Sequence, residues 1–380
     1  MKIKFWQILF LSFCIFSFQN KKETIKRCND PEILNNVVRS IPHIINFQDT
    51  IQNDTLLEYV DKNNQPQYYS RNILTGVCIN GECRQANINL FWTQTGRYLG
   101  FELPPGEFLS RAKHKPFFPE DYDRLHKLLA NPLSPLAHYS ITDLVPPIDS
   151  TKGPKADAVT SATLTDLLNY IVKGAVYTTY TLWHIVYGQT KREIENITAQ
   201  QLTPELTMIL LGNTNIDDQV WALNHIPGRI VINEKLLNKL MENISGDDVY
   251  LVERSLNVLQ PEILAKDSIQ QQLANIYLHS GFLQQRLILE KLQDAPVLKP
   301  VLLHQFAENL SKTNGILVKL MMDLFTSKRV DDQLVTEEVG KLLKNENRYI
   351  AKQAVKYLEN LSDVDKKTAR SIEKYKKKNL

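Results

Sequence analysis

Residues 86–92 read Ala-Asn-Ile-Asn-Leu-Phe-Trp, and this stretch decides the fold of the first part of the chain. Its apolar and polar side chains mostly alternate, which is the two-residue period of a strand with one buried face. Gln94-Thr95-Gly96 then forms a turn, and a second strand-like run, Tyr98–Leu103, ends at Pro104. With a further run after Gln65, we predict three or four antiparallel strands and, with the helices around them, an α+β domain.

A tight hairpin precedes this stretch. The segment Val77–Cys83 has Asn80-Gly81 at its centre, and Asn-Gly is the strongest short signal for a two-residue hairpin turn. That turn places Cys78 opposite Cys83 as a non-hydrogen-bonded pair, with Cα atoms about 4.5 Å apart, at the short end of disulfide geometry. We predict a structural disulfide between Cys78 and Cys83. A bridge from Cys28 to one of them, and a redox-active pair, are the alternatives.

The N-terminus has the pattern of a secretory signal. Lys2 and Lys4 precede a mostly apolar run, Phe5–Phe18, of signal-peptide length. We therefore expect residues 1–20 to be a signal peptide and the protein to be exported, periplasmic or extracellular, where a disulfide persists. An uncleaved anchor is the alternative. Because the chain has no stretch of about 18 apolar residues, we predict no transmembrane helix beyond this segment.

Composition excludes several classes of protein. Apolar residues make up 43% of the chain and charged residues 23%, as in globular proteins, so the chain is not disordered as a whole. The 45 Lys and Arg against 42 Asp and Glu give a net charge of +3, which argues against a nucleic-acid partner. Neither a glycine-rich phosphate loop nor local spacing typical of a hydrolase is present, so a hydrolase or transferase is not indicated.

The chain divides into four parts on these patterns. They are the signal peptide (1–20), an N-terminal segment with a helix near Glu32–Ser40 (21–59), the α+β domain (60–190) and an all-α domain (200–380). Within the α+β domain we expect one long helix over about Leu164–Tyr187, closed by Gly188.

The all-α domain shows an internal period. Five apolar helix ends align at residues 226, 259, 292, 324 and 358. The apolar residues three positions earlier in these ends are Leu223, Leu256, Leu289, Met321 and Val355. An apolar pair that recurs about every 33 residues is expected of stacked helical hairpins, each too small to bury its own face. This part resembles HEAT-type helical repeats. An irregular all-α bundle is the alternative.

One short motif carries chemistry. Residues 157–163 read Asp-Ala-Val-Thr-Ser-Ala-Thr. This resembles the attachment motif of covalent FMN-binding domains of respiratory complexes and secreted flavoproteins, which is Asp, two residues, Ser/Thr, Gly, Ala, Thr. Asp157, Thr160, Ala162 and Thr163 match that motif, and Ser161 stands where the family usually has glycine.

The resemblance implies that a flavin transferase joins FMN to Thr163 by a phosphoester. Asp157 would be read by the transferase or would help bind the metal used in the transfer. A helix that begins at Thr163 would stabilise the phosphodiester, because helix N-termini favour anions. His184 is a candidate for lining the flavin pocket, against the alternative of a core histidine. The implied function is extracytoplasmic electron transfer, with a redox partner protein docked on the helical repeats.

The motif also has a purely structural interpretation. Thr163 and Asp166 fit the capping-box pattern, in which Thr163 only caps the following helix. The first domain would then carry no flavin. On this interpretation the protein is an exported scaffold that binds other proteins through its helical repeats.

Overall fold

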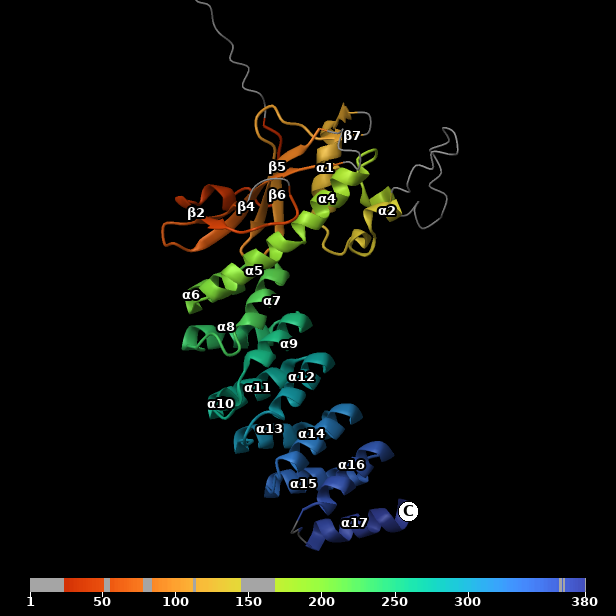
Figure 1. Ribbon diagram of the computed structural model, residues 1–380. Coiled ribbons are helices and arrows are strands. Elements are labelled where there is room, and N and C mark those ends of the chain that lie inside the picture. Colours follow the sequence, from red (N-terminus) through yellow and green to blue (C-terminus); the bar gives the residue numbers. More distant parts are fainter. Residues whose placement is uncertain are drawn as a thin grey trace, which may run out of the picture. The chain divides into compact units, whose positions relative to one another are not determined.

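The chain consists of two compact units, Met1–Gln200 and Gln201–Leu380. The computed structural model describes residues 24–50, 55–77, 84–111, 114–144, 168–361, 364 and 366–379 (Figure 1). The predicted signal peptide and the hairpin with Cys78 and Cys83 lie outside the described residues.

The first unit is built on a six-stranded antiparallel sheet, which confirms the α+β prediction at the level of fold class. In spatial order the strands are β1 (Lys26–Cys28), β6 (Tyr98–Glu102), β5 (Ala86–Thr93), β4 (Pro66–Thr75), β3 (Thr55–Val60) and β2 (Arg39–Ile44). A small second sheet pairs β7 (Ser110–Arg111) with β8 (Lys115–Pro116). The main sheet therefore starts well before residue 60 and uses the N-terminal segment.

The helix predicted near Glu32–Ser40 is wrong. Ile33–Asn35 forms one short 3₁₀ turn, η1, and Arg39 already begins β2, which pairs with β3 in the register Arg39↔Val60. Arg39–Ile44 instead pairs along its whole length with β3, a contact with a later segment that the local pattern does not show. Pro42 lies within β2. β2 is an edge strand of the sheet, where proline is tolerated.

Alternation along the central strands gives the sheet two different faces. Tyr69 and Trp92 are register partners on β4 and β5, and both are completely buried in the main core. Their neighbours Tyr68 and Phe91 belong to a smaller cluster that η1 covers. The main core also takes side chains from the helices α1 (Pro119–Leu129), α4 (Val176–Val186) and α5 (Gln189–Gln201) and from the short elements η3 (Pro135–His138) and α2 (Ile141–Leu144).

The single long helix predicted over Leu164–Tyr187 is wrong in the part that is described. A 3₁₀ turn, η4 (Leu168–Tyr170), is separated from α4 by a turn in which Gly174 has φ of +75°. That left-handed conformation interrupts an α-helix, and glycine adopts it without strain. The predicted end is confirmed: α4 ends at Val186, and a Cβ on Gly188 would lie 2.4 Å from the His184 carbonyl oxygen.

The second unit is helix after helix, as predicted, and residues 204–361 contain no strand wherever they are described. The first helices of its hairpins are α6 (Pro204–Leu211), α8 (Glu234–Ser245), α11 (Asp267–His279), α13 (Pro300–Asn309) and α15 (Gln333–Lys341). The second helices are α7 (Ile216–His225), α9 (Val249–Val258), α12 (Phe282–Leu292), α14 (Gly315–Ser327) and α16 (Arg348–Glu359). Three short turns, α10 (Pro261–Leu264), η5 (Leu310–Lys312) and η6 (Leu342–Lys344), connect some of them, and α17 (Lys366–Asn379) follows.

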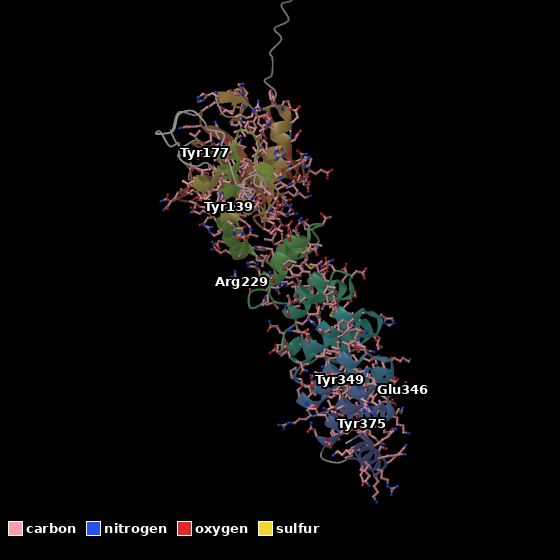
Figure 2. The ribbon with its side chains drawn as sticks, turned by 90° about the vertical axis from the view of Figure 1, so that its right-hand side faces the viewer. Tyr139, Tyr177, Arg229, Glu346, Tyr349 and Tyr375 are labelled. Carbon is pink, nitrogen blue, oxygen red and sulfur yellow. The ribbon has the colours of Figure 1, made fainter. Side chains whose placement is uncertain are left out.

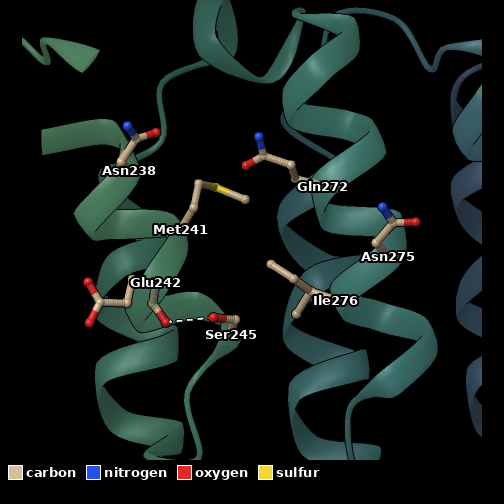
Figure 3. A pocket seen from close by; sticks show the side chains of 7 residues that line it. All are labelled: Asn238, Met241, Glu242, Ser245, Gln272, Asn275 and Ile276. Atoms are coloured by element: carbon tan, nitrogen blue, oxygen red, sulfur yellow. Dashed lines mark hydrogen bonds between the residues drawn. The ribbon is translucent and has the colours of Figure 1, made fainter. Parts of the chain in front are cut away.

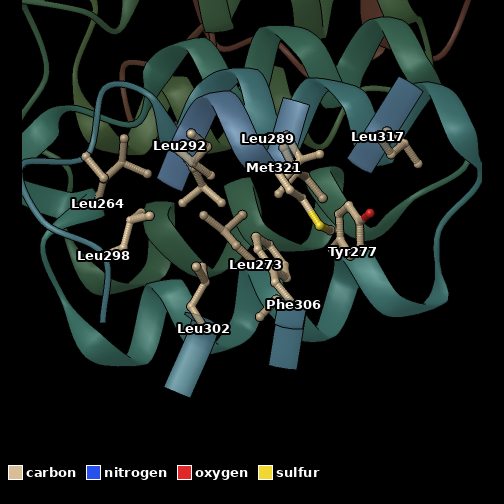
Figure 4. Close-up of a cluster of buried hydrophobic side chains, with 14 of the residues drawn as sticks. Leu264, Leu273, Tyr277, Leu289, Leu292, Leu298, Leu302, Phe306, Leu317 and Met321 are labelled. Atoms are coloured by element: carbon tan, nitrogen blue, oxygen red, sulfur yellow. The ribbon is translucent and has the colours of Figure 1, made fainter. Parts of the chain in front are cut away.

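The second helices are regularly spaced. Each begins 33 residues after the one before, from Ile216 to Arg348. They pack against one another in sequence order, and the first helices from α11 to α15 do the same (Figure 1). The uniform spacing corrects one position of the sequence alignment, because Met322 and not Met321 stands 33 residues after Leu289. Both methionines are buried in the shared core. Figure 4 shows Met321 among the buried side chains.

Local capping explains why these helices begin where they do. Side chains of Asn215, Asp248, Asn314 and Asn347 each accept a hydrogen bond from the first backbone N–H groups of the second helix. Asparagine and aspartate are the preferred residues for this role. At the equivalent position α12 has Gly281, which has no side chain to accept such a bond.

Candidate functional site

The predicted flavin site falls mostly outside the described residues. Asp157, Thr160, Ser161, Ala162 and Thr163 all lie there, as do Cys78 and Cys83. The structure therefore describes one of the predicted site residues, His184.

His184 lies on α4 among aromatic rings of the same helix. Its ring centroid is 4.0 Å from that of Tyr180 and 5.1 Å from that of Trp183. Nδ1 lies 2.9 Å from the Tyr180 carbonyl oxygen, and since a carbonyl can only accept, Nδ1 donates. His184 is half-buried, so its ring edge remains partly open to a ligand.

The neighbouring aromatic residues of α4 are structural. The Trp183 indole N–H donates to the Asn131 carbonyl oxygen at 3.0 Å, and the Tyr187 hydroxyl donates to that of Leu129 at 2.7 Å. Buried Trp and Tyr usually find such partners. The two bonds tie the C-terminal end of α4 to the last residue of α1 and to the turn after it, so these rings serve packing.

A second polar cluster in this unit is also structural. Arg71 is fully buried on β4, and its guanidinium donates to both carboxylate oxygens of Asp49, at 2.8 and 3.2 Å. The hydroxyls of Thr50 and Thr190 accept two further bonds, and the guanidinium carbon lies 3.5 Å from the centre of the Phe47 ring. These contacts join β4, α5 and the loop after β2.

The helical unit carries a feature that the sequence analysis missed, a recurring set of exposed apolar side chains. They occupy the first two positions of the second helices, and each is between 39% and 57% exposed. We call this set the apolar row; it consists of Ile216, Val249, Tyr250, Phe282, Leu283, Ile316 and Tyr349. Reading the 33-residue period at the helix starts instead of the helix ends would have found it.

A shallow hollow interrupts the apolar row where α12, α14 and α16 begin. It has a volume of about 360 Å³ and is lined by Phe282, Asn314, Gly315, Ile316, Asn347 and Tyr349. Gly315 forms part of the wall: a Cβ there would lie 3.3 Å from Cδ1 of Tyr349. Since glycine has no side chain, the wall stays open at this point.

Basic residues stand next to the lining residues in the sequence. Lys312 and Lys344 lie in the turns that lead into α14 and α16, and Arg348 is the first residue of α16; all three are exposed. The exposed acid among them is Glu346 (Figure 2). At the equivalent place before α9 the chain instead has Asp247 and Asp248.

A second groove lies between two first helices, α8 and α11. It has a volume of about 430 Å³ and is mostly polar (Figure 3). Amides of Asn238, Gln272 and Asn275 line it, and the Ser245 hydroxyl donates to the Glu242 carbonyl oxygen at 2.8 Å. The amides and the one carboxylate could form hydrogen bonds with a ligand. The residues that line this groove do not include a nucleophile hydrogen-bonded to a side-chain base.

Comparisons with known proteins find no relative: no protein-family model, curated protein or solved structure matches the chain. Within the described residues, no group of three or more His, Cys, Asp or Glu side chains is arranged to hold a metal ion. No helix in that part of the chain is long and apolar enough to cross a membrane.

Proposed function

We propose that the protein is an exported scaffold whose helical unit binds a segment of another protein along the apolar row. The observation that supports this function is the repetition of exposed apolar side chains at one structural position in successive hairpins. A single exposed apolar residue needs no explanation, but exposed apolar residues repeated at one position of successive packed helices indicate an interaction surface.

The chemistry of the row fits a protein partner. Two of its members are tyrosines and one is a phenylalanine, residue types enriched at protein interfaces. The row stands on helix starts that the buried core holds in place, so little conformational entropy would be lost on binding.

A displayed peptide library tests this function. The full chain is compared with the double variant Ile316→Asp, Tyr349→Asp, which makes part of the row polar. The matched control is Val301→Asp, a similarly exposed valine on α13 outside the row. The wild type and the control should enrich the same peptides, and the double variant should lose them. Equal binding by all three proteins would contradict the proposal.

Flavin attachment at Thr163 is the second candidate function. The residues of the motif over 157–163 favour it, and on this proposal the apolar row docks the redox partner. The flavin would supply the redox chemistry, and the protein would hold and orient it.

Co-expression with a flavin transferase tests the attachment. We expect in-gel flavin fluorescence that survives denaturation, and an intact mass raised by one FMN less one water, with both absent in Thr163→Val. Ser161→Gly, which restores the usual motif, should be modified at least as completely. An unmodified mass in both the wild type and Ser161→Gly would rule the attachment out.

A further inference from the structure

We infer that the hollow at the starts of α12, α14 and α16 receives a bulky apolar side chain from a partner segment whose flanking residues are acidic. This inference rests on the proposed binding function and adds the chemistry of the partner.

The apolar part of the inference follows from the wall of the hollow. Phe282, Ile316 and Tyr349 come from three successive hairpins and are 39%, 57% and 45% exposed. An inserted side chain would cover all three at once, and removing apolar surface from water is favourable. Gly315 lets the Tyr349 ring approach the start of α14, since a Cβ there would lie 3.3 Å from Cδ1 of that ring.

The acidic part follows from charge. Helices α12, α14 and α16 are each at least eleven residues long, and their N-terminal ends all contribute residues to this hollow. Each N-terminus carries about half a positive charge. Lys312 and Lys344 stand two and three residues before the lining residues Asn314 and Asn347, and Arg348 directly follows Asn347; Glu346 is the acid in the same two segments. A carboxylate beside the inserted side chain is therefore favoured here.

Position along the row gives the partner a direction. The start of α7 has Asp217 and the turn before α9 has Asp247 and Asp248, so that end of the row repels an anion. The acidic residues of the partner should therefore lie at the α12–α16 end of the apolar row.

Gly281 offers a matched pair of variants. A Cβ there would meet no atom within 4 Å, and its φ of −75° suits any residue. Asparagine and aspartate cap helices about equally well. Gly281→Asn and Gly281→Asp should therefore affect folding alike and differ only by a negative charge beside the hollow.

The test measures peptide binding to the full chain by fluorescence anisotropy. The probes are synthetic peptides with one central tryptophan flanked by glutamates, serines or lysines. The glutamate peptide should bind best, and its affinity should fall as salt rises. Gly281→Asp should weaken it several-fold while Gly281→Asn leaves it unchanged, and Ile316→Asp should abolish it.

The outcomes separate the inference from the proposed function. Equal binding of the glutamate and serine peptides, or equal effects of the two Gly281 variants, would overturn the inference. If peptides selected from the library depend on the row but are not acidic, the scaffold function stands and the inference fails. Dimerisation of the chain in sedimentation that Ile316→Asp abolishes would also overturn it, because the occupant would then be a second copy.

Discussion

Gly315 and Tyr349 begin the second helices of neighbouring hairpins, and they approach so closely that a Cβ on Gly315 would lie 3.3 Å from Cδ1 of the tyrosine ring. The same Cβ would lie 3.4 Å from Cγ1 of Ile350, the buried residue that follows Tyr349 on α16. Glycine at this place therefore lets two repeats meet at their helix starts and leaves the hollow beside them open.

Filling the hollow should block binding without unfolding the unit. In Gly315→Leu the added side chain would occupy the hollow or push the exposed Tyr349 ring outward. We expect a loss of peptide affinity of at least about tenfold, which corresponds to about 1.4 kcal/mol. Anisotropy with the library-selected peptide measures the effect, and circular dichroism confirms that the helices remain. Unchanged affinity in a folded variant would show that the hollow takes no part in binding.

Helix caps should contribute unequally along the repeats. The Asn314 side chain accepts bonds from both Ile316 and Leu317 N–H, at 3.0 and 3.1 Å, so Asn314→Ala should destabilise the unit by about 1 kcal/mol. Gly281→Asn adds the missing acceptor and should stabilise it by a few tenths of a kcal/mol. Urea unfolding followed by circular dichroism measures both changes, and the prediction fails if they have the same sign.

Sequence patterns predicted the fold class because both units obey simple periods. Alternation in residues 86–92 matches the structure, in which Ile88, Leu90 and Trp92 are fully buried. The alignment by helix ends still revealed the hairpin period, because each second helix has buried apolar residues near its end. This held although α14 is longer than expected and ends at Ser327. The helix starts are more regular, since capping residues fix them.

Sequence patterns failed where long-range pairing decides the structure. Residues 39–44 become a strand because β3 offers them a partner, which no local window reveals. The turn at Gly174 was missed for a local reason, because a single glycine with φ of +75° ends the helical pattern before α4. The apolar row escaped notice for another reason: the period was aligned at the helix ends, whose apolar residues are buried, and not at the helix starts.

Removing one partner of the buried ion pair between Arg71 and Asp49 should destabilise the protein far more than breaking an ion pair on the surface. Arg71 is completely buried, so Asp49→Ala would leave its charge without a counterion, at a cost of about 3–5 kcal/mol. The control is Glu290→Ala, which breaks the exposed pair with Arg286 and should cost less than about 1 kcal/mol. Hydrogen exchange of the β4 amides measures the first effect and that of the α12 amides the second. Similar small losses in both would contradict the prediction.

The stability of the helical unit should fall at low pH because Asp332, which caps α15, becomes protonated. Burial opposes its ionisation, but the Val335 N–H at 3.1 Å and the His304 side chain at 3.1 Å outweigh burial. They hold the pKa of the Asp332 carboxyl below its ordinary value of 3.8. A carboxyl with a lowered pKa in the folded state stabilises that state above its ordinary pKa and loses this contribution as the pH falls through the lowered value.

Asp332→Asn isolates this contribution, because asparagine keeps the capping oxygen but does not ionise. At pH 5 we expect the variant to be less stable than the wild type by up to about 1 kcal/mol, the range for a partly exposed ion pair. The difference should shrink toward zero as the pH falls from 3.8 through the lowered pKa of the folded state, below which the wild-type carboxyl is also neutral. Urea unfolding of both proteins across this range measures it.

Asn233 caps α8 with a neutral amide, so the cost of Asn233→Ala should stay constant over the same range. If the Asp332→Asn difference also stays constant, the charge of Asp332 does not stabilise the unit.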